Sequence, residues 1–153
     1  LENQRYGVLV VDIRLKGMSG LQLQSELLRR NVDIEMVVIS GQATVADAIS
    51  AFDNRASAFF EKPFNNQQLL EAVQKLRQKW EKRHARLAAI ESRLAPLSIR
   101  EKEVMAALVA GRNTVQVARE LNISPSTVEK HRLKILEKTG VDSLIQLIHL
   151  TAI

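Results

Sequence analysis

The sequence predicts an α/β unit with a parallel sheet, joined by a long helix to an all-α unit of four helices. Three observations support this prediction. Short apolar runs alternate with helical patterns over residues 1–67, as expected for parallel strands joined by helices. Residues 68–95 contain neither glycine nor proline. Residues 96–153 hold four helical segments, each preceded by a capping signal.

The composition fits two small folded domains. The chain has 153 residues, of which 46% are apolar, and a net charge of +5. It lacks cysteine, which excludes a disulfide scaffold, a thiolate zinc site and a thiol nucleophile and fits a reducing compartment. No apolar run reaches the roughly 20 residues of a membrane helix, and the first residues show no signal peptide. We therefore expect a soluble cytoplasmic protein that does not engage a membrane.

Three strands are predicted in the first segment. The run GVLVVD at residues 7–12 is continuously apolar up to its final acid, a pattern typical of a strand buried on both faces. Similar runs follow at residues 36–40 and 58–60. Leucines at helical spacing follow Gly20, and residues 44–53 form a second helical pattern. This β-α-β-α-β order predicts a parallel sheet with functional groups at the carboxyl ends of its strands.

Those strand ends carry Asp12, Ser40 and Lys62. A carboxylate, a hydroxyl and an ammonium group at one sheet edge suit a phosphoryl site, because they supply an acceptor, a hydrogen-bonding partner and a counter-charge. The alternative is that the three side chains simply face solvent. An aspartyl-nucleophile phosphatase also places an Asp after a parallel strand, but it needs a second Asp two residues later, where this chain has Arg14. We therefore expect no enzyme activity.

Residues 68–95 predict one long helix with a heptad seam. Its apolar positions are spaced 4, 3, 4, 7, 3 and 4 residues apart: Leu69, Val73, Leu76, Trp80, Leu87, Ile90 and Leu94. Such a seam favours pairing with another helix, as in a coiled coil between two copies of the chain. The alternative is that the seam packs on the chain's own domains.

The last segment predicts a helix-turn-helix. Ser98 with Glu101, and Asn113 with Gln116, form capping boxes for two helices. Ser124 and Pro125 open a third helix as cap and first residue. A fourth helix begins after another cap, Ser143.

The third helix of this segment is the candidate DNA-reading element. Val128 and Ile135 lie seven residues apart and would face the core. A different face carries residues able to contact phosphates and base edges in a major groove, so we assign DNA contact to Thr127, Glu129, Lys130, His131, Arg132 and Lys134. Helix-turn-helix geometry also occurs in helical domains that bind no DNA, which is the alternative.

The positive charge is unevenly distributed. The net charge is −1 over residues 1–67, +4 over residues 68–95 and +2 over residues 96–153. A basic face favours polyanions such as nucleic acid, although a charged helix face is also simply solvated.

Taken together, these motifs resemble the NarL/FixJ family of two-component response regulators, and FixJ-like regulators most. Residues 97–104 (LSIREKEV) resemble the opening LTxREREVL of the LuxR-type DNA-binding domain, and residues 121–132 (LNISPSTVEKHR) resemble its turn and recognition helix. Residues 8–15 (VLVVDIRL), 39–41 (ISG) and 59–64 (FFEKPF) resemble the acceptor, switch and last-strand motifs of a receiver domain.

The resemblance implies a role for each of these residues. Asp12 would accept a phosphoryl group from a sensor histidine kinase, Ser40 and Lys62 would hold the phosphoryl oxygens, and Phe59 would be the aromatic switch residue. Mg²⁺ would bind Asp12 and the backbone carbonyl of Arg14. The bond between Lys62 and Pro63 would be cis. The regulator would bind double-stranded DNA as a homodimer.

The chain departs from the family pattern at its front. A complete receiver has a flavodoxin-like sheet in the order 2-1-3-4-5, and this sequence starts at what corresponds to the third strand. The sequence therefore predicts a partial receiver that lacks the acidic pair of the Mg²⁺ site and leaves one sheet edge unpaired. A degenerate receiver would instead make the chain a phosphorylation-independent DNA binder or a partner-binding scaffold. A second departure is Arg55, where the family usually has glycine.

Overall fold

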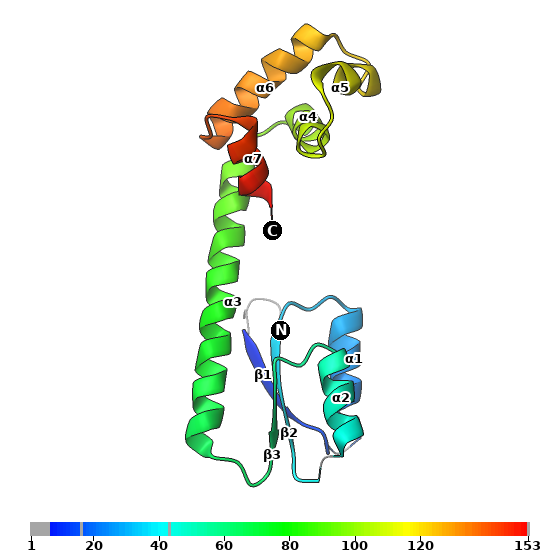
Figure 1. Cartoon of the computed structure of the whole chain (residues 1–153), viewed down its shortest axis with the longest axis vertical. Coiled ribbons are helices and arrows are strands. Elements are labelled where there is room, and N and C mark those ends of the chain that lie inside the picture. The colour runs from blue at the N-terminus through cyan, green and yellow to red at the C-terminus, as the bar shows by residue number, and fades with distance from the viewer. Residues whose placement is uncertain (1–6, 16, 43, 153) are drawn as a thin grey trace. The chain divides into compact units, whose positions relative to one another are not determined.

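The computed structural model describes residues 7–15, 17–42 and 44–152. The chain forms two compact units that divide between His84 and Ala85. This division lies inside the long helix α3, Asn66–Leu94 (Figure 1). The long helix predicted over residues 68–95 is present, and its two parts belong to different units.

The described part of the first unit is built on a three-stranded parallel sheet in the order β1-β2-β3. Its strands are β1 (Val8–Asp12), β2 (Glu35–Ser40) and β3 (Ala58–Glu61), joined by α1 (Gly20–Arg29) and α2 (Val45–Asp53). The predicted alternation is confirmed, as is the α/β class. The helices α1 and α2 lie on one side of the sheet and the first part of α3 on the other (Figure 1).

The core of this unit lies where α1 and α2 meet the sheet. Val38 of β2 is fully buried and packs with Val11 and Ala51. Gln24 of α1 is also fully buried, and its amide donates to the main-chain oxygens of Ala51 (2.9 Å) and Asn54 (3.0 Å). Those bonds tie α1 to the end of α2.

The turn after α2 has an unusual backbone conformation. Arg55 has a φ of 65°, which lies in the left-handed region that glycine adopts more easily than any other residue. Arg55 therefore keeps the backbone conformation that the family's usual glycine would favour, although it carries a side chain.

The seam of α3 is covered by the chain's own residues. All seven predicted seam positions are buried or half-buried within the single chain. The Trp80 indole N–H donates to the main-chain oxygen of Asp33 (2.9 Å), and its ring stacks on His84 with 3.6 Å between centroids. Arg83 pairs with both Asp33 and Glu35. Packing on the chain's own domain thus accounts for Trp80, whereas pairing with a second copy stays a prediction.

The second unit contains four shorter helices after the end of α3: α4 (Ile99–Val109), α5 (Thr114–Glu120), α6 (Pro125–Thr139) and α7 (Leu144–Thr151). Each predicted cap accepts a hydrogen bond from the backbone of its helix: Ser98, Asn113, Ser124 and Ser143. Asn122, with a φ of 51°, forms the turn between α5 and α6. The predicted helix-turn-helix is confirmed.

The core of the second unit includes the predicted inner face of α6. Val128 and Ile135 are fully buried and pack with Val104, Val117 and Leu147. Burying each such side chain contributes about 1.5–3 kcal/mol relative to exposure, so these five residues fix how α6 sits on its neighbours. None of the described helices is long and apolar enough to cross a membrane.

Candidate functional site

The first candidate site lies where the carboxyl ends of the strands meet. Asp12 ends β1, Ser40 ends β2, and Lys62 comes directly after β3. The Lys62 ammonium nitrogen lies 2.6 Å from Oδ2 of Asp12, and the Lys62 backbone N–H donates to the Ser40 carbonyl oxygen (2.7 Å). The structure therefore brings the three predicted residues together, and the peptide bond between Lys62 and Pro63 is cis.

Asp12 is poised as an ionised carboxylate. Its Oδ1 accepts the backbone N–H of Arg14 (2.8 Å) while Oδ2 pairs with Lys62. Both hydrogen bonds lower the pKa of Asp12 below its ordinary value, and the bond from Lys62 has the larger effect. The side chain is 24% exposed, so an incoming group has access to a negatively charged oxygen.

Ser40 is more buried than Asp12, and Phe59 is half-buried as Asp12 is. Ser40 is 1% exposed, and its hydroxyl accepts the backbone N–H of Gln42 (3.3 Å). Phe59 is half-buried and packs against the cluster formed by Val11, Val38 and Ala51. Ser40 thus lies at the same sheet edge as Asp12, whereas Phe59 of β3 packs against residues of β1, β2 and α2.

Gly20 holds the acceptor loop, a role that the sequence analysis missed. A Cβ atom at Gly20 would lie 2.3 Å from the carbonyl oxygen of Asp12, closer than atoms can approach. The Gly20 backbone N–H also donates to the carbonyl oxygen of Ile13 (2.9 Å). Only a residue without a side chain lets α1 start this close to Asp12. The glycine at the start of the helical pattern is the signal for this role, but by itself it indicates only a turn.

The donors at this site suit part of a magnesium shell. Mg²⁺ prefers hard oxygen ligands and is bound by one or two carboxylates, water and phosphate oxygens. Asp12 supplies a carboxylate and Arg14 a backbone carbonyl, which fit that chemistry. Among the described residues there is no cluster of three or more histidine, cysteine, aspartate or glutamate side chains placed to hold a metal. Of the two predicted ligands, Asp12 would contribute the carboxylate and Arg14 the backbone carbonyl.

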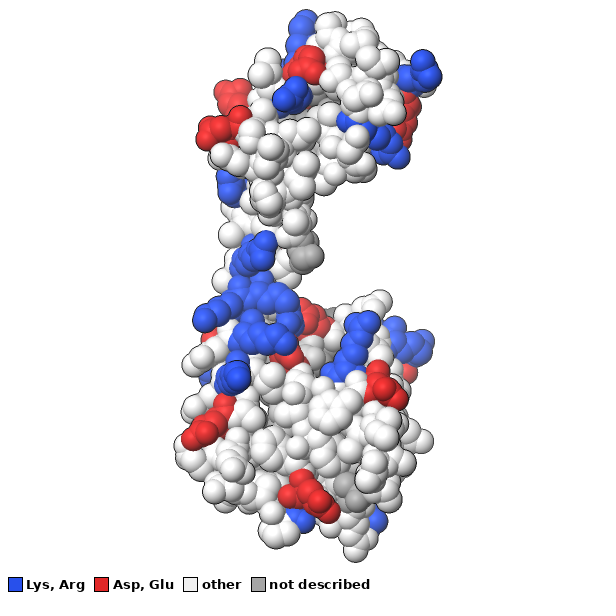
Figure 2. All heavy atoms as spheres, viewed as in Figure 1, with Lys and Arg blue, Asp and Glu red and all other residues white. Residues whose placement is uncertain are grey.

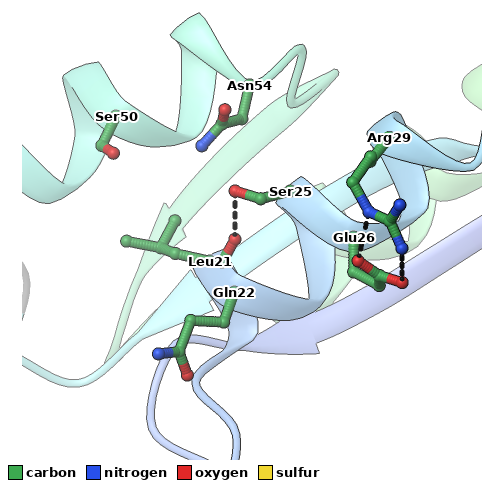
Figure 3. Close-up of a pocket in the computed structure, with 7 residues that line it drawn as sticks. All are labelled: Leu21, Gln22, Ser25, Glu26, Arg29, Ser50 and Asn54. Atoms are coloured by element: carbon green, nitrogen blue, oxygen red, sulfur yellow. Dashed lines mark hydrogen bonds and ion pairs between the residues drawn. The ribbon is translucent and has the colours of Figure 1, made fainter.

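A groove between α1 and α2 is separate from this site (Figure 3). It has a volume of about 320 Å³ and is lined by Leu21, Gln22, Ser25, Glu26, Arg29, Ser50 and Asn54. Within it Ser25 donates to the Leu21 carbonyl, and Arg29 pairs with Glu26 (Figure 3). None of the predicted site residues lines this groove.

The second candidate site is the outer face of α6. Lys130 and Lys134 are exposed there. Glu129, by contrast, accepts a hydrogen bond from the Thr114 hydroxyl (2.7 Å) and pairs with Arg132 (3.3 Å). Its carboxylate joins α5 to α6, so within the unit it has a structural role.

Thr127 has a partner within the unit, whereas His131 has no described hydrogen bond from its side chain. The Thr127 hydroxyl lies 2.8 Å from the hydroxyl of the cap residue Ser124. His131 is half-buried, and its Nδ1 has no hydrogen-bond partner in the described structure. Thr127 therefore supports the start of the helix.

Two interactions that the sequence analysis missed fix the end of α6. The Arg93 guanidinium, from the last turn of α3, donates to the carbonyl oxygens of Thr139 and Gly140 (both 2.8 Å). Lys138 pairs with the nearly buried Glu101 of α4 (2.7 Å). The hydrogen bond from Lys138, together with one from the Ser98 backbone N–H, lowers the pKa of Glu101 to about 2. Partners so far apart in sequence carry no local pattern, so only the fold reveals them.

On the face drawn in Figure 2, the densest group of basic side chains lies away from α6. Figure 2 shows a group of Lys and Arg side chains over α3, the segment that holds a net +4 of the chain's charge. The total charge is therefore a poor guide to the residues that would read a DNA sequence.

Comparison with known proteins covers both units. A family model described as bacterial regulatory proteins, luxR family, matches residues 95–151, and a response regulator receiver domain model matches residues 1–74. The chain is 36% identical over 149 residues to the transcriptional regulatory protein FixJ of Rhizobium meliloti, covering 95% of this chain and 73% of that protein. It is 34% identical over 148 residues to the transcriptional regulatory protein TdiR of Thauera aromatica, covering 94% of this chain and 65% of that protein.

Two solved structures of response regulators are also similar to this chain. The response regulator StyR matches with a TM-score of 0.61 and 35% identity, over 96% of this chain and 76% of that chain. Full-length FixJ from B. japonicum matches with a TM-score of 0.51 and 30% identity, over 96% of this chain and 74% of that chain.

Proposed function

The chain belongs to the family of two-component response regulators that join a receiver domain to a LuxR-type DNA-binding domain, and we propose that Asp12 is its phosphorylation site. The ion pair between Asp12 and Lys62 at 2.6 Å carries this proposal. It keeps the carboxylate ionised and holds a cation beside the place where phosphoryl oxygens would gather.

The reaction transfers one phosphoryl group from a phosphohistidine of a sensor kinase. A carboxylate oxygen of Asp12 attacks phosphorus, the new O–P bond forms as the histidine N–P bond breaks, and the histidine nitrogen keeps the electron pair. The Lys62 ammonium then pairs with a phosphoryl oxygen, and the Ser40 hydroxyl turns from Gln42 to donate to another. Phe59, packed below the strand ends, would sense this movement of Ser40.

Bound Mg²⁺ would offset the negative charge that builds up between the phosphoryl group and the carboxylate. Asp12 and the Arg14 carbonyl would contribute ligands to it. This chain's own part is to orient the acceptor through the Arg14 backbone N–H and the close packing of Gly20.

DNA binding is assigned to α6 in a major groove. Lys130 and Lys134 are free of described ion pairs and would contact phosphates or base edges, with His131 and Arg132 beside them. Thr127 and Glu129 would help mainly by fixing the start of α6 and its packing on α5. Helix-turn-helix proteins bind two half-sites as dimers, which supports a homodimer on DNA.

The helix α3 is the element that would carry the signal. Arg83 ties it to Asp33 and Glu35 in the first unit, and Arg93 ties it to the end of α6 in the second. Phosphorylation would bias the equilibrium between two arrangements of such an element. The family consists of transcription regulators, so we expect no turnover of a phosphomonoester. The expected location is the bacterial cytoplasm, because the kinase and the DNA are both accessible there.

Labelling with a radioactive acyl phosphate in the presence of Mg²⁺ tests the acceptor. Where an acidic pair completes the Mg²⁺ site, we expect the native protein and an Asp53→Asn variant, which alters an exposed acid of α2, to be labelled equally, and an Asp12→Asn variant to remain unlabelled. Without that pair we expect negligible labelling of Asp12. Equal labelling of the Asp12→Asn variant would move the acceptor elsewhere. An unlabelled native chain that still binds DNA would favour the alternative, a phosphorylation-independent DNA binder.

A further inference from the structure

Leu133 is an apolar side chain that the fold leaves in solvent. It lies in the middle of α6 and is 67% exposed. Val128 and Ile135 on the same helix are fully buried, and Leu136 is packed against the core. Leu133 therefore contributes little to the packing of the second unit and is free to contact another molecule.

The neighbours of Leu133 are the two exposed lysines. Lys130 precedes it by three residues, which places the two side chains one turn apart on one face, and Lys134 follows it directly. The next residue along that face is Glu137, also exposed. Leu133 is therefore a small apolar spot with Lys130 and Lys134 beside it and Glu137 one turn further along the helix, while Glu129 is paired with Thr114 and Arg132.

We propose that Leu133 packs against the 5-methyl group of a thymine and so selects thymine over cytosine at one position of each half-site. This inference rests on the proposed binding of DNA by α6. In the major groove the methyl group of thymine is the one apolar feature of the base edges, and apolar side chains contact it. The two exposed lysines beside Leu133 give this part of α6 positive charge, which suits the phosphates of a nucleic acid and favours a nucleic acid over a protein as the occupant of this face.

The size of the effect follows from the area involved. Burying one methyl-sized group is worth about 0.8 kcal/mol, which corresponds to about a fourfold change in affinity. A single methyl contact therefore tunes sequence preference without controlling overall affinity, which depends on the phosphate contacts.

The test begins with selection of binding sites from random double-stranded DNA by the full chain. The selected site is then remade with uracil in place of each thymine in turn, which removes only the methyl group. We expect one uracil per half-site to weaken binding by the native chain about fourfold and to leave binding by a Leu133→Ala variant unchanged.

Two further variants serve as controls. Leu133→Met keeps a long apolar side chain and should retain the discrimination against uracil. Ile99→Ala alters the 81% exposed Ile99 in α4 and should behave as the native chain. Since Leu133 is exposed and alanine is a strong helix former, the alanine variant should unfold at the native temperature, so a change in discrimination reports the DNA interaction and not folding.

Equal discrimination by the native chain and Leu133→Ala, with DNA binding retained by both, would overturn this inference and leave the proposed function standing. If no uracil substitution weakens binding by the native chain, the inference is likewise overturned while the proposed function stands. Leu133 would then be assigned to a protein partner. Failure of the native chain to bind any DNA would overturn the proposed function itself.

Discussion

The Lys62 ammonium nitrogen lies 2.6 Å from Oδ2 of Asp12, across the ends of two strands that are not neighbours in the sheet. This ion pair links β1 to the segment after β3 and leaves the other carboxylate oxygen to the Arg14 backbone. It places a counter-charge where phosphorylation needs one and keeps the acceptor ionised.

Replacing Lys62 should therefore affect both the acidity and the reactivity of Asp12. In a Lys62→Met variant we expect the pKa of Asp12 to rise toward its ordinary value, because the hydrogen bond that lowers it most is removed. Labelling by an acyl phosphate should slow about tenfold, the effect of removing one charge-assisted hydrogen bond of about 1.5 kcal/mol. Titration of the Asp12 carboxyl by NMR and the initial labelling rate measure the two effects. An unchanged rate would remove Lys62 from the site.

Gly20 should not tolerate even a methyl group. The added Cβ would meet the Asp12 backbone at 2.3 Å, so α1 or the acceptor loop must shift. We expect Gly20→Ala to lower the free energy of unfolding by about 1–3 kcal/mol, as overpacking does. In Gly41→Ala the added Cβ would lie 3.8 Å from the Lys62 side chain, an ordinary separation, so that variant should be near native in urea unfolding. Equal midpoints for both variants would contradict the close packing of Gly20.

The pair formed by Glu101 and Lys138 should make the second unit sensitive to acid. The pKa of Glu101 is about 2 in the folded chain, below the 4.5 that it has when unpaired. A lowered pKa stabilises the folded state above pH 4.5, and this stabilisation is lost as the pH falls from 4.5 toward 2. A Glu101→Gln variant should lose that dependence, so its stability should vary less with pH in this window. Calorimetry between pH 2 and 6 checks it, and parallel curves would refute the role.

The exposed lysines of α6 should determine how DNA binding responds to salt. Removing a lysine that neutralises one phosphate should reduce the slope of log affinity against log salt by about 1. We expect Lys130→Ala and Lys134→Ala to weaken binding and flatten this slope, and Lys102→Ala, an exposed lysine on α4, to serve as the reference. Fluorescence anisotropy over a range of salt concentrations measures the slopes. Native slopes in both α6 variants would mean that another face meets the DNA.

The local elements of this fold were predictable because their signals are local. The caps at Ser98, Asn113, Ser124 and Ser143 act on backbone groups three residues away, and each appears in the structure as expected. The strand ends at Asp12 and Ser40 were predictable for the same reason, since a continuous apolar run marks a buried parallel strand.

Interactions between distant segments were not predictable. Nothing in the sequence near Arg93 indicates that it caps α6 at Thr139, 46 residues later. The seam of α3 illustrates the same limit: heptad spacing shows that one face is apolar, but not whether Trp80 meets another chain or, as the structure has it, the segment at Asp33. The resemblance supplied the role of Phe59, which composition and spacing alone did not indicate.

The most direct test of the account compares the DNA affinity of the phosphorylated and unphosphorylated chain at its selected site. Phosphorylation should tighten binding by the native chain, and treatment of an Asp12→Asn variant with the same acyl phosphate should leave its affinity unchanged. Equal affinities for the two forms of the native chain, with Asp12 shown to be labelled, would contradict the claim that phosphorylation of the first unit controls DNA binding by the second.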